Sequence, residues 1–233
     1  MAVFPTIAID GPASSGKSAV GFAVAQALGF VFFDTGCLYR AVTALALERA
    51  LDLHAPQALA DLAMQAHFHI LPATQPDGRQ YTVLVGKRDI TWNLRDAAVD
   101  SAVSQVASVP AVRAILTAQM QVIATEQSTV MVGRDIGTVV VPGATLKIYL
   151  TASAVERARR RHAQNLAQGW PSDYAQILSG LQARDRLDTS RAAAPLTQAP
   201  DAVRLDSTHL DLAQTVAQIL TLWQAKVGDC AVG

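Results

Sequence analysis

The chain has 233 residues, of which 51% are hydrophobic and 16% are charged, and its 19 basic residues balance 19 acidic ones. This composition excludes the disordered, collagen-like and polybasic classes, so we expect no nucleic-acid partner. The length suits one compact domain with a full hydrophobic core. Since the sequence has neither a leader-like start nor an apolar run of about 18 residues, we expect a cytoplasmic protein with no membrane partner.

The first elements in chain order predict a parallel sheet. An apolar segment rich in β-branched residues, Val3 to Ile9, is typical of a buried strand and leads into a glycine-rich turn. Helical spacing of apolar residues then predicts a helix from Lys17 to a cap at Gly29, and Phe30 to Phe33 predicts a second strand. A strand, a helix and a strand in this order form a βαβ unit, whose first turn is the expected ligand site.

The middle of the chain changes its periodicity twice. Residues 41–66 and 95–126 have mostly helical spacing, whereas residues 67–91 alternate between apolar and polar on either side of the turn Pro76-Asp77-Gly78. This alternation predicts an antiparallel hairpin. Because a hairpin does not belong in a parallel sheet, we interpret residues 67–91 as a small insertion in a single domain.

The last part of the chain predicts further elements of the main sheet and its helices. Strands are expected at 129–132, 146–150 and 202–205, and helices at 154–168 and 173–187. A closing helix is expected to run to about Lys226. Asp206, Ser207 and Thr208 are residue types that cap helices, so we expect them to start this closing helix.

The strongest chemical signal lies in the turn after the first strand. Its sequence, Gly11-Pro12-Ala13-Ser14-Ser15-Gly16-Lys17-Ser18, is a complete G-x-x-x-x-G-K-S motif, or P-loop. The glycines let backbone N–H groups approach phosphate oxygens, and Lys17 adds a full charge at the β- and γ-phosphates. The Ser18 hydroxyl is a suitable ligand for Mg²⁺. The motif predicts that residues 11–18 and the adjoining Ala19 bind a nucleoside triphosphate with Mg²⁺.

Arginines near the ends of later strands indicate a second phosphate. Arg40 follows the second strand and is expected to face the P-loop across a cleft, and Thr35 before it is expected to cap the next helix. An ordinary cap and a surface arginine fit this segment equally well. Arg134 and Asp135 follow a buried strand, at the sheet edge where ligands of α/β proteins bind. Arginine suits this task because its planar fork binds phosphate oxygens with two hydrogen bonds.

Two further charge clusters lie toward the C-terminus. Arg157, Arg160 and Arg161 share one predicted helix and are expected to contact phosphates, with a basic solvated face as the alternative. A second cluster, Arg184-Asp185-Arg186 with Asp188 and Arg191, is expected just beyond the following helix, where mixed charges fit a surface ion-pair network equally well.

Taken together, these motifs closely resemble the bacterial cytidylate kinases, a family of nucleoside monophosphate kinases. The resemblance spans nearly the whole chain. It rests on IAIDGPASSGKS (7–18), DTGCLYRAVT (34–43), SQVASVPAVR (104–113), GRDIGTVVVPGATLKIYLTAS (133–153), ERARRR (156–161) and RDRLDTSRAAAPL (184–196). It implies an α/β P-loop kinase fold of three layers, with a central parallel sheet, helices on both faces, a mobile lid and an acceptor-side antiparallel insertion at roughly 67–91.

The resemblance also implies an activity and a set of site residues. The reaction would transfer the γ-phosphoryl group of ATP to CMP, and to dCMP, in pyrimidine nucleotide metabolism. The residues implied to act on the transferring group are Lys17, Arg134 and three lid arginines, Arg157, Arg160 and Arg161. Those implied to bind the acceptor are Thr35, Arg40 and Arg134 near its phosphate, Asp188 near its ribose, Ser104, Arg113 and Asp135 at cytosine with Arg191 close by, and Arg184.

Three positions depart from the family pattern. Val132 stands where the family usually has an aspartate before G-R-D, so a carboxylate that helps to orient metal-bound water or an arginine is absent. Ser18-Ala19 replaces the usual end of the P-loop, a mild change. Met120 stands where the family often has an arginine.

Two other functions stay open on sequence alone. One is a P-loop kinase for another small acceptor, such as a different nucleoside monophosphate or shikimate. The other is a GTP-binding switch or a catalytically silent nucleotide sensor. A GTPase carries an N/T-K-x-D element for guanine, and Gly86-Lys87-Arg88-Asp89 falls short of it. We expect a monomer whose ligands are ATP and CMP or dCMP.

Overall fold

The chain folds into two compact units. A computed structural model describes residues 4–191 and 193–230, except for the side chains of Asp229 and Cys230. One unit combines Met1–Phe33 with Gln127–Gly233, and the other comprises Asp34–Glu126. The predicted insertion at 67–91 lies within the second unit, and its boundaries as a subdomain stay a prediction.

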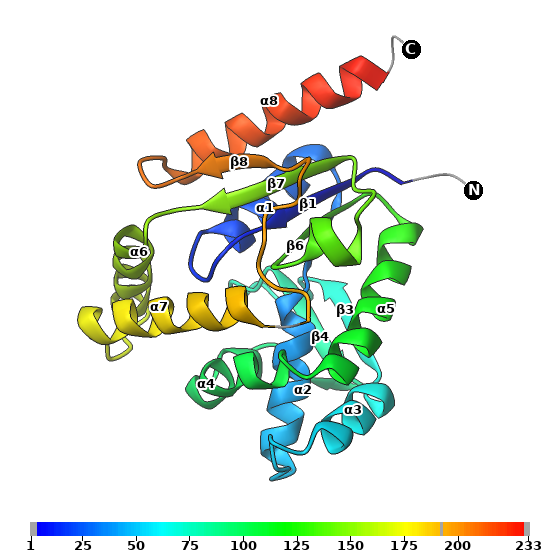
Figure 1. Ribbon diagram of the computed structural model, residues 1–233, viewed down its shortest axis with the longest axis vertical. Coiled ribbons are helices and arrows are strands. Elements are labelled where there is room, and N and C mark those ends of the chain that lie inside the picture. Colours follow the sequence, from blue (N-terminus) through cyan, green and yellow to red (C-terminus); the bar gives the residue numbers. More distant parts are fainter. Residues whose placement is uncertain (1–3, 192, 231–233) are drawn as a thin grey trace. The chain divides into compact units, whose positions relative to one another are not determined.

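The first unit is built on a five-stranded sheet in the order β2-β6-β1-β7-β8 (Figure 1). β1 pairs in parallel with β6 and with β7, and β7 pairs in parallel with β8. The predicted parallel sheet is therefore confirmed, although Val3, where the first strand was expected to begin, lies outside the described residues. The strands are β1 (Thr6–Asp10), β2 (Val31–Asp34), β6 (Thr129–Gly133), β7 (Leu146–Thr151) and β8 (Val203–Asp206).

Helices of the first unit pack on this sheet and on one another. Residues of β1, β6 and β7 form one apolar core with Val20 and Val24 of α1 and with Ile219 and Trp223 of α8. α6 packs against α7 beyond the end of β7 (Figure 1). The predicted cap at Gly29 is confirmed, since Gly29 adopts a left-handed φ of 66°. The elements are α1 (Lys17–Leu28), the π-helical turn η2 (Ile136–Val140), α6 (Ala154–Ala167), α7 (Tyr174–Ser190) and α8 (Leu212–Cys230).

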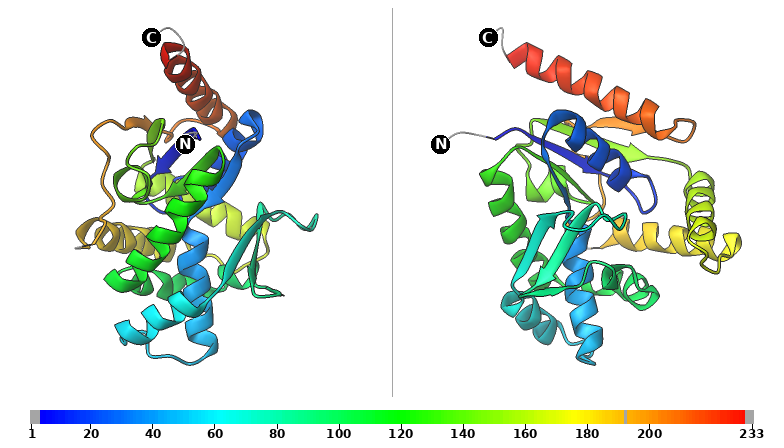
Figure 2. Two further views of the ribbon diagram at one scale, coloured as in Figure 1. Left: turned by 90° about the vertical axis from the view of Figure 1, so that its right-hand side faces the viewer. Right: turned by 180° about the vertical axis from the view of Figure 1, so that it is seen from behind.

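The second unit combines helices with a small antiparallel sheet, shown from two sides in Figure 2. β3 pairs antiparallel with β4, which confirms the predicted hairpin, and a short third strand extends it. Together with the parallel sheet this confirms the predicted fold class, whereas lid mobility stays a prediction. The elements are α2 (Gly36–Glu48), α3 (Pro56–Gln65), β3 (Phe68–Pro72), β4 (Tyr81–Val85), β5 (Arg88–Asp89), the 3₁₀ turn η1 (Asn93–Arg95), α4 (Ala97–Val106) and α5 (Pro110–Glu126).

A buried arginine organises the turn between β3 and β4. The Arg79 guanidinium donates to Asp77 at 2.6 Å and to Asp89 at 2.5 Å, and its side chain is only 4% exposed. The indole N–H of Trp92 donates to the same Asp77 carboxylate. Asp89 pairs with Arg79 of the hairpin turn, and Arg88 pairs with Glu48 of α2. Two residues of the segment Gly86 to Asp89, which was compared with a guanine-binding element, therefore make ion pairs within this unit.

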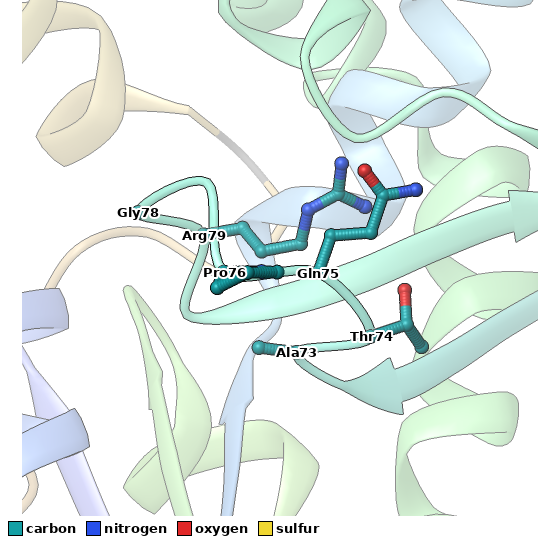
Figure 3. A pocket seen from close by; sticks show the side chains of 6 residues that line it. All are labelled: Ala73, Thr74, Gln75, Pro76, Gly78 and Arg79. Atoms are coloured by element: carbon teal, nitrogen blue, oxygen red, sulfur yellow. The ribbon is translucent and has the colours of Figure 1, made fainter.

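A shallow cavity of about 420 Å³ lies on the same turn (Figure 3). None of the site residues predicted from the sequence lines it. Its lining residues are Ala73, Thr74, Gln75, Pro76, Gly78 and Arg79.

The start of α8 differs from the prediction. The helix begins after Asp211, whose carboxylate accepts the N–H of Gln214 at 2.8 Å while the Gln214 side chain accepts the N–H of Asp211 at 3.0 Å. This reciprocal pair is a capping box. The expected caps instead shape the turn after β8, where Asp206 accepts from the N–H and hydroxyl of Thr208. Several capping residue types in a row made the position ambiguous in the sequence.

Among the described helices, no single one has the length and apolar character that crossing a membrane requires. α4 and α5 meet that test only when they are taken together, as a pair bent by 99°.

The capping box predicts a matched pair of stability effects. Replacing Asp211 with alanine removes the acceptor for the Gln214 N–H, so we expect Asp211→Ala to lower the free energy of unfolding by about 1 kcal/mol. Asp211→Asn keeps a capping oxygen and is expected to stay within a few tenths of a kcal/mol of the wild type. Urea unfolding of the three proteins measures both. Equal loss in the two variants would contradict the assignment of the cap.

Candidate active site

The P-loop has the backbone conformation of an anion-binding turn. Ser14 and Gly16 both adopt positive φ values, 57° and 90°. Left-handed residues in such a turn gather successive N–H groups into a concave nest that favours anions. A Cβ at Gly11 would lie 2.0 Å from the carbonyl oxygen of Leu150, so only glycine fits there. Because α1 begins directly after Gly16, its N-terminal dipole adds to the attraction for phosphate.

Three consecutive carbonyl groups of the P-loop each accept a hydrogen bond from a cation. The Gly11 carbonyl accepts from Arg134 at 3.0 Å, that of Pro12 from Lys17 at 2.9 Å, and that of Ala13 from Arg157 at 3.0 Å. A peptide group is planar and trans, so the fixed carbonyls of Pro12 and Ala13 also fix the directions of the Ala13 and Ser14 N–H groups, whereas Pro12, which follows Gly11, has no N–H. The structure thus brings three of the predicted catalytic residues, Lys17, Arg134 and Arg157, together at the P-loop.

Helix α7 supplies a carboxylate partner to Arg134 and another to Arg157. Arg134 Nε donates to Asp188 at 2.8 Å, and the Arg157 guanidinium donates to both oxygens of Asp185, at 2.6 and 3.1 Å. Residues three apart lie on the same face of a helix, which is why Asp185 and Asp188 reach neighbouring partners. From the sequence, Asp185 was predicted only as a member of a mixed-charge cluster, with no role of its own. Its only signal was its place in the charge run with Arg184, from which no partner could be read.

Asp188 and Arg191 at the end of α7 form a largely buried cluster with Asp135, whereas Arg184 and Asp185 are partly exposed and Arg186 is exposed. Asp188 and Asp135 are 6% and 4% exposed. Arg191 lies 3.7 Å from the Asp188 carboxylate and 3.9 Å from that of Asp135. Burial alone raises the pKa of Asp188. The charge and hydrogen bond of Arg134, together with the charges of Arg184 and Arg191, outweigh burial, so the pKa is lowered from its usual value. Asp188 therefore stays ionised at neutral pH and can hold the arginines in place.

Asp10, at the end of β1, is a second residue that the sequence analysis missed. Its two carboxylate oxygens accept the N–H groups of Ile136 and Gly137, both at 2.8 Å. These bonds tie the segment that follows Arg134 and Asp135 to the strand that leads into the P-loop. Burial raises the pKa of Asp10 to about 6, against the lowering effect of the two backbone N–H groups.

The arginines of α6 take different positions. Arg160 donates to Glu156, to the Ser207 hydroxyl and to the Ser207 carbonyl. A Cβ at Gly16 would lie 3.8 Å from Arg160 Nη1, so Arg160 borders the P-loop. Arg161 is partly exposed. The alternative of a basic solvated face holds for Arg159, whose side chain is 67% exposed, but not for Arg157 or Arg160.

The remaining predicted acceptor residues lie in the second unit. Arg40 donates to the Leu94 carbonyl at 3.0 Å and pairs with Asp100. Arg113 is 5% exposed and lies over the Tyr39 ring at 5.2 Å, a cation–π contact. Ser104 is partly exposed on α4.

Thr35 does not cap α2 as predicted. It occupies the position before the helix, but its side chain makes no capping hydrogen bond. The physical reason is its backbone, since φ of −63° and ψ of −22° are already helical, whereas a capping residue is extended. The carboxylate of Asp34 accepts the N–H of Gly36 at 3.1 Å instead.

Comparison with known proteins assigns this arrangement to a family. The family model described as Cytidylate kinase matches residues 7–225. The chain is 45% identical to a cytidylate kinase of Geobacillus kaustophilus over 223 residues, 96% of this chain and 98% of that protein. It is 51% identical to a cytidylate kinase of Herpetosiphon aurantiacus over 185 residues, 79% of this chain and 81% of that protein. The chain belongs to the cytidylate kinase family.

A solved structure also resembles this member of the cytidylate kinase family. A gluconokinase from Sinorhizobium meliloti aligns with 95% of the chain and 92% of its own length, at 16% identity and a TM-score of 0.49. This likeness is too weak to support the assignment, which rests on the sequence matches.

Two departures from the cytidylate kinase pattern are now located. Val132 is fully buried in the core of the first unit, and a Cβ at Gly21 of α1 would lie 2.5 Å from its Cγ1. Its side chain therefore faces α1 and not the P-loop arginines. Met120 is 1% exposed and belongs to the buried face of α5. Both positions serve packing in this chain.

The raised pKa of Asp10 predicts a pH effect with a defined sign. The folded protein retains the Asp10 proton up to about pH 6, whereas the unfolded chain releases it near pH 4, so this group's contribution to stability falls as pH rises through that window. Asp10→Asn lacks this titration. Between pH 4 and pH 7 we expect the stability of the wild type to decline relative to Asp10→Asn by about 2 kcal/mol. Chemical denaturation at several pH values tests this, and a pH-independent difference would contradict it.

Proposed function

We propose that this protein transfers the γ-phosphoryl group of ATP to CMP, and to dCMP, to form CDP or dCDP and ADP. The observation that carries the proposal is the gathering of Lys17, Arg134 and Arg157 at the P-loop of a chain that belongs to the cytidylate kinase family along nearly its whole length. A switch or a silent sensor does not require several cations at the phosphate site, so this gathering favours a kinase.

Mg²⁺ fits the residues present. The described residues contain no group of three or more carboxylate, histidine or cysteine ligands, which is what a dedicated protein cage for a metal would need. Mg²⁺ commonly keeps water and binds nucleotide phosphates with only one or two protein ligands. We propose Ser18 as that ligand. When bound, the ion neutralises charge on the β- and γ-phosphates.

The proposed mechanism needs no strong general base. The phosphate of a nucleoside monophosphate is largely ionised near neutral pH, so its oxygen can attack the γ-phosphorus of ATP in line. The contribution of the chain is positioning and charge. Lys17 lies at the donor phosphates, and Arg134 and Arg40 bind the acceptor phosphate. Closure of the α6 arginines Arg160 and Arg161 over the nucleotide, which would exclude water, is part of the proposal, whereas Arg157 is already held at the P-loop by Ala13 and Asp185.

Recognition of cytosine is assigned to three polar side chains. Cytosine offers an amino donor, which the Asp135 carboxylate can accept, and ring acceptors, which Arg113 and Ser104 can satisfy. Uracil lacks the amino donor, so a site built for cytosine is left with an unpaired buried acceptor. Thr35, Arg184, Asp188 and Arg191 complete the proposed acceptor site. Localisation in the cytoplasm and a monomeric state remain expectations.

A coupled assay of ADP release tests the activity. With ATP and Mg²⁺ we expect strong turnover with CMP, weaker turnover with UMP, and almost none with AMP, GMP, shikimate or no acceptor. Lys17→Ala is expected to lower kcat for CMP by about 10²- to 10³-fold, since it removes a charge at the transferring group. ADP release without an acceptor would indicate an ATPase or a switch, and preference for another acceptor would refute the substrate.

The base-reading proposal has its own test. Asp135→Asn replaces a pure acceptor with an amide that can also donate, so we expect the ratio of kcat/KM for CMP to that for UMP to fall by about tenfold or more. Asp211→Asn, which removes a charge at the start of α8, serves as the matched control and is expected to leave the ratio unchanged. An unchanged ratio in Asp135→Asn would exclude this residue from base recognition.

A further inference from the structure

We propose that Asp185 is a positioning residue that holds the P-loop in its phosphate-binding shape, acting through Arg157 on the backbone at Ser14. The inference rests on the proposed function, because it concerns the loop that binds the phosphates of ATP. It gives a role to a carboxylate for which the sequence suggested none.

The contacts of Arg157 fix its guanidinium from three elements. Nε donates to the Ala152 carbonyl at 3.0 Å, Nη1 to the Ala13 carbonyl at 3.0 Å, and the Asp185 carboxylate accepts from both Nη1 and Nη2. The side chain is 5% exposed, whereas that of Asp185 is 26% exposed. A two-pronged arginine–carboxylate pair of this kind sets direction as well as energy. Asp185 thus determines where the Arg157 guanidinium points.

The backbone at Ser14 needs such support. Its φ of 57° is left-handed, a conformation that costs energy for any residue with a Cβ. Strained backbone of this kind persists only where surrounding contacts hold it. The Ala13 carbonyl belongs to the same planar peptide group as the Ser14 N–H, so the bond from Arg157 holds that peptide against rotation. Without it, the peptide is free to rotate and turn the Ser14 N–H out of the nest.

This explanation differs from a purely structural ion pair in one checkable respect. If Asp185 only stabilised the packing of α6 on α7, the residue at position 14 would not influence the effect of losing it. If Asp185 supports the left-handed Ser14, then glycine at position 14 removes the need for support, because glycine adopts positive φ without a steric cost. The effect of Asp185→Asn on nucleotide binding should therefore depend on whether position 14 is serine or glycine.

Calorimetric titration with ADP and Mg²⁺ measures this dependence without any acceptor. We expect Asp185→Asn to weaken ADP binding by about tenfold in the Ser14 background, the size expected for a charge-assisted hydrogen bond. In the Ser14→Gly background we expect the same substitution to weaken binding by less than about twofold. Asp211→Asn is the matched charge control and is expected to bind ADP like the wild type. Equal losses in both backgrounds, or no loss in either, would overturn the proposal.

Two further measurements keep the outcome decisive. Thermal unfolding without ligand reports whether each variant is folded. If Asp185→Asn does not fold, Asp185→Glu, which keeps the charge but displaces it, is compared in the same two backgrounds with the same criterion. The proposed function has a different criterion for failure, which is that the wild type does not phosphorylate CMP. Because ADP binding needs no acceptor, that failure leaves the test of Asp185 intact.

Discussion

The hydrogen bonds from Lys17, Arg134 and Arg157 to three consecutive carbonyls determine the shape of the P-loop. Lys17 begins α1, directly after the loop, whereas Arg134 and Arg157 lie 123 and 144 residues beyond the carbonyls that they bind. Each bond orients one peptide group, so groups of the chain itself determine the shape of the turn. A site that is organised before its ligand arrives avoids the cost of ordering it at the moment of reaction.

Holding guanidinium groups in a buried place has an electrostatic cost. Removing charges from water is unfavourable unless partners of opposite sign and good geometry offset the loss. Asp185 and Asp188, one helical turn apart on α7, are those partners for Arg157 and Arg134. The same helix therefore supplies counter-charges to two of the three cations. This makes α7 part of the proposed nucleotide site, although it follows the P-loop by more than 150 residues.

The valine at position 132 shows why a missing motif residue needs a location before it is interpreted. The sequence indicated the loss of a carboxylate from the metal environment. Val132 instead packs in the core against α1, while a carboxylate on the adjacent strand, Asp10, binds the backbone that follows Arg134 and Asp135. The register places Asp10 beside Gly133, one residue beyond Val132. Because successive side chains along a strand point to opposite faces of the sheet, a residue that packs in the core can directly precede a position beside the candidate site.

Local pattern and spacing were enough to predict the βαβ start, the P-loop and the β3–β4 hairpin, because these depend on residues close in the chain. The parallel sheet, in which Thr6 pairs with Thr129, followed instead from the alternation of strands and helices. The family motifs named the candidate site residues, whose roles stay predictions. What only the tertiary structure decided was pairing over long separations. Arg157 could have been a solvated lid residue until Asp185 and Ala13 were found beside it, and Asp10 carried no signal until η2 was placed over it. A charged side chain in a sequence shows its chemistry but not its partner, and the partner decides whether it binds, positions or is merely solvated.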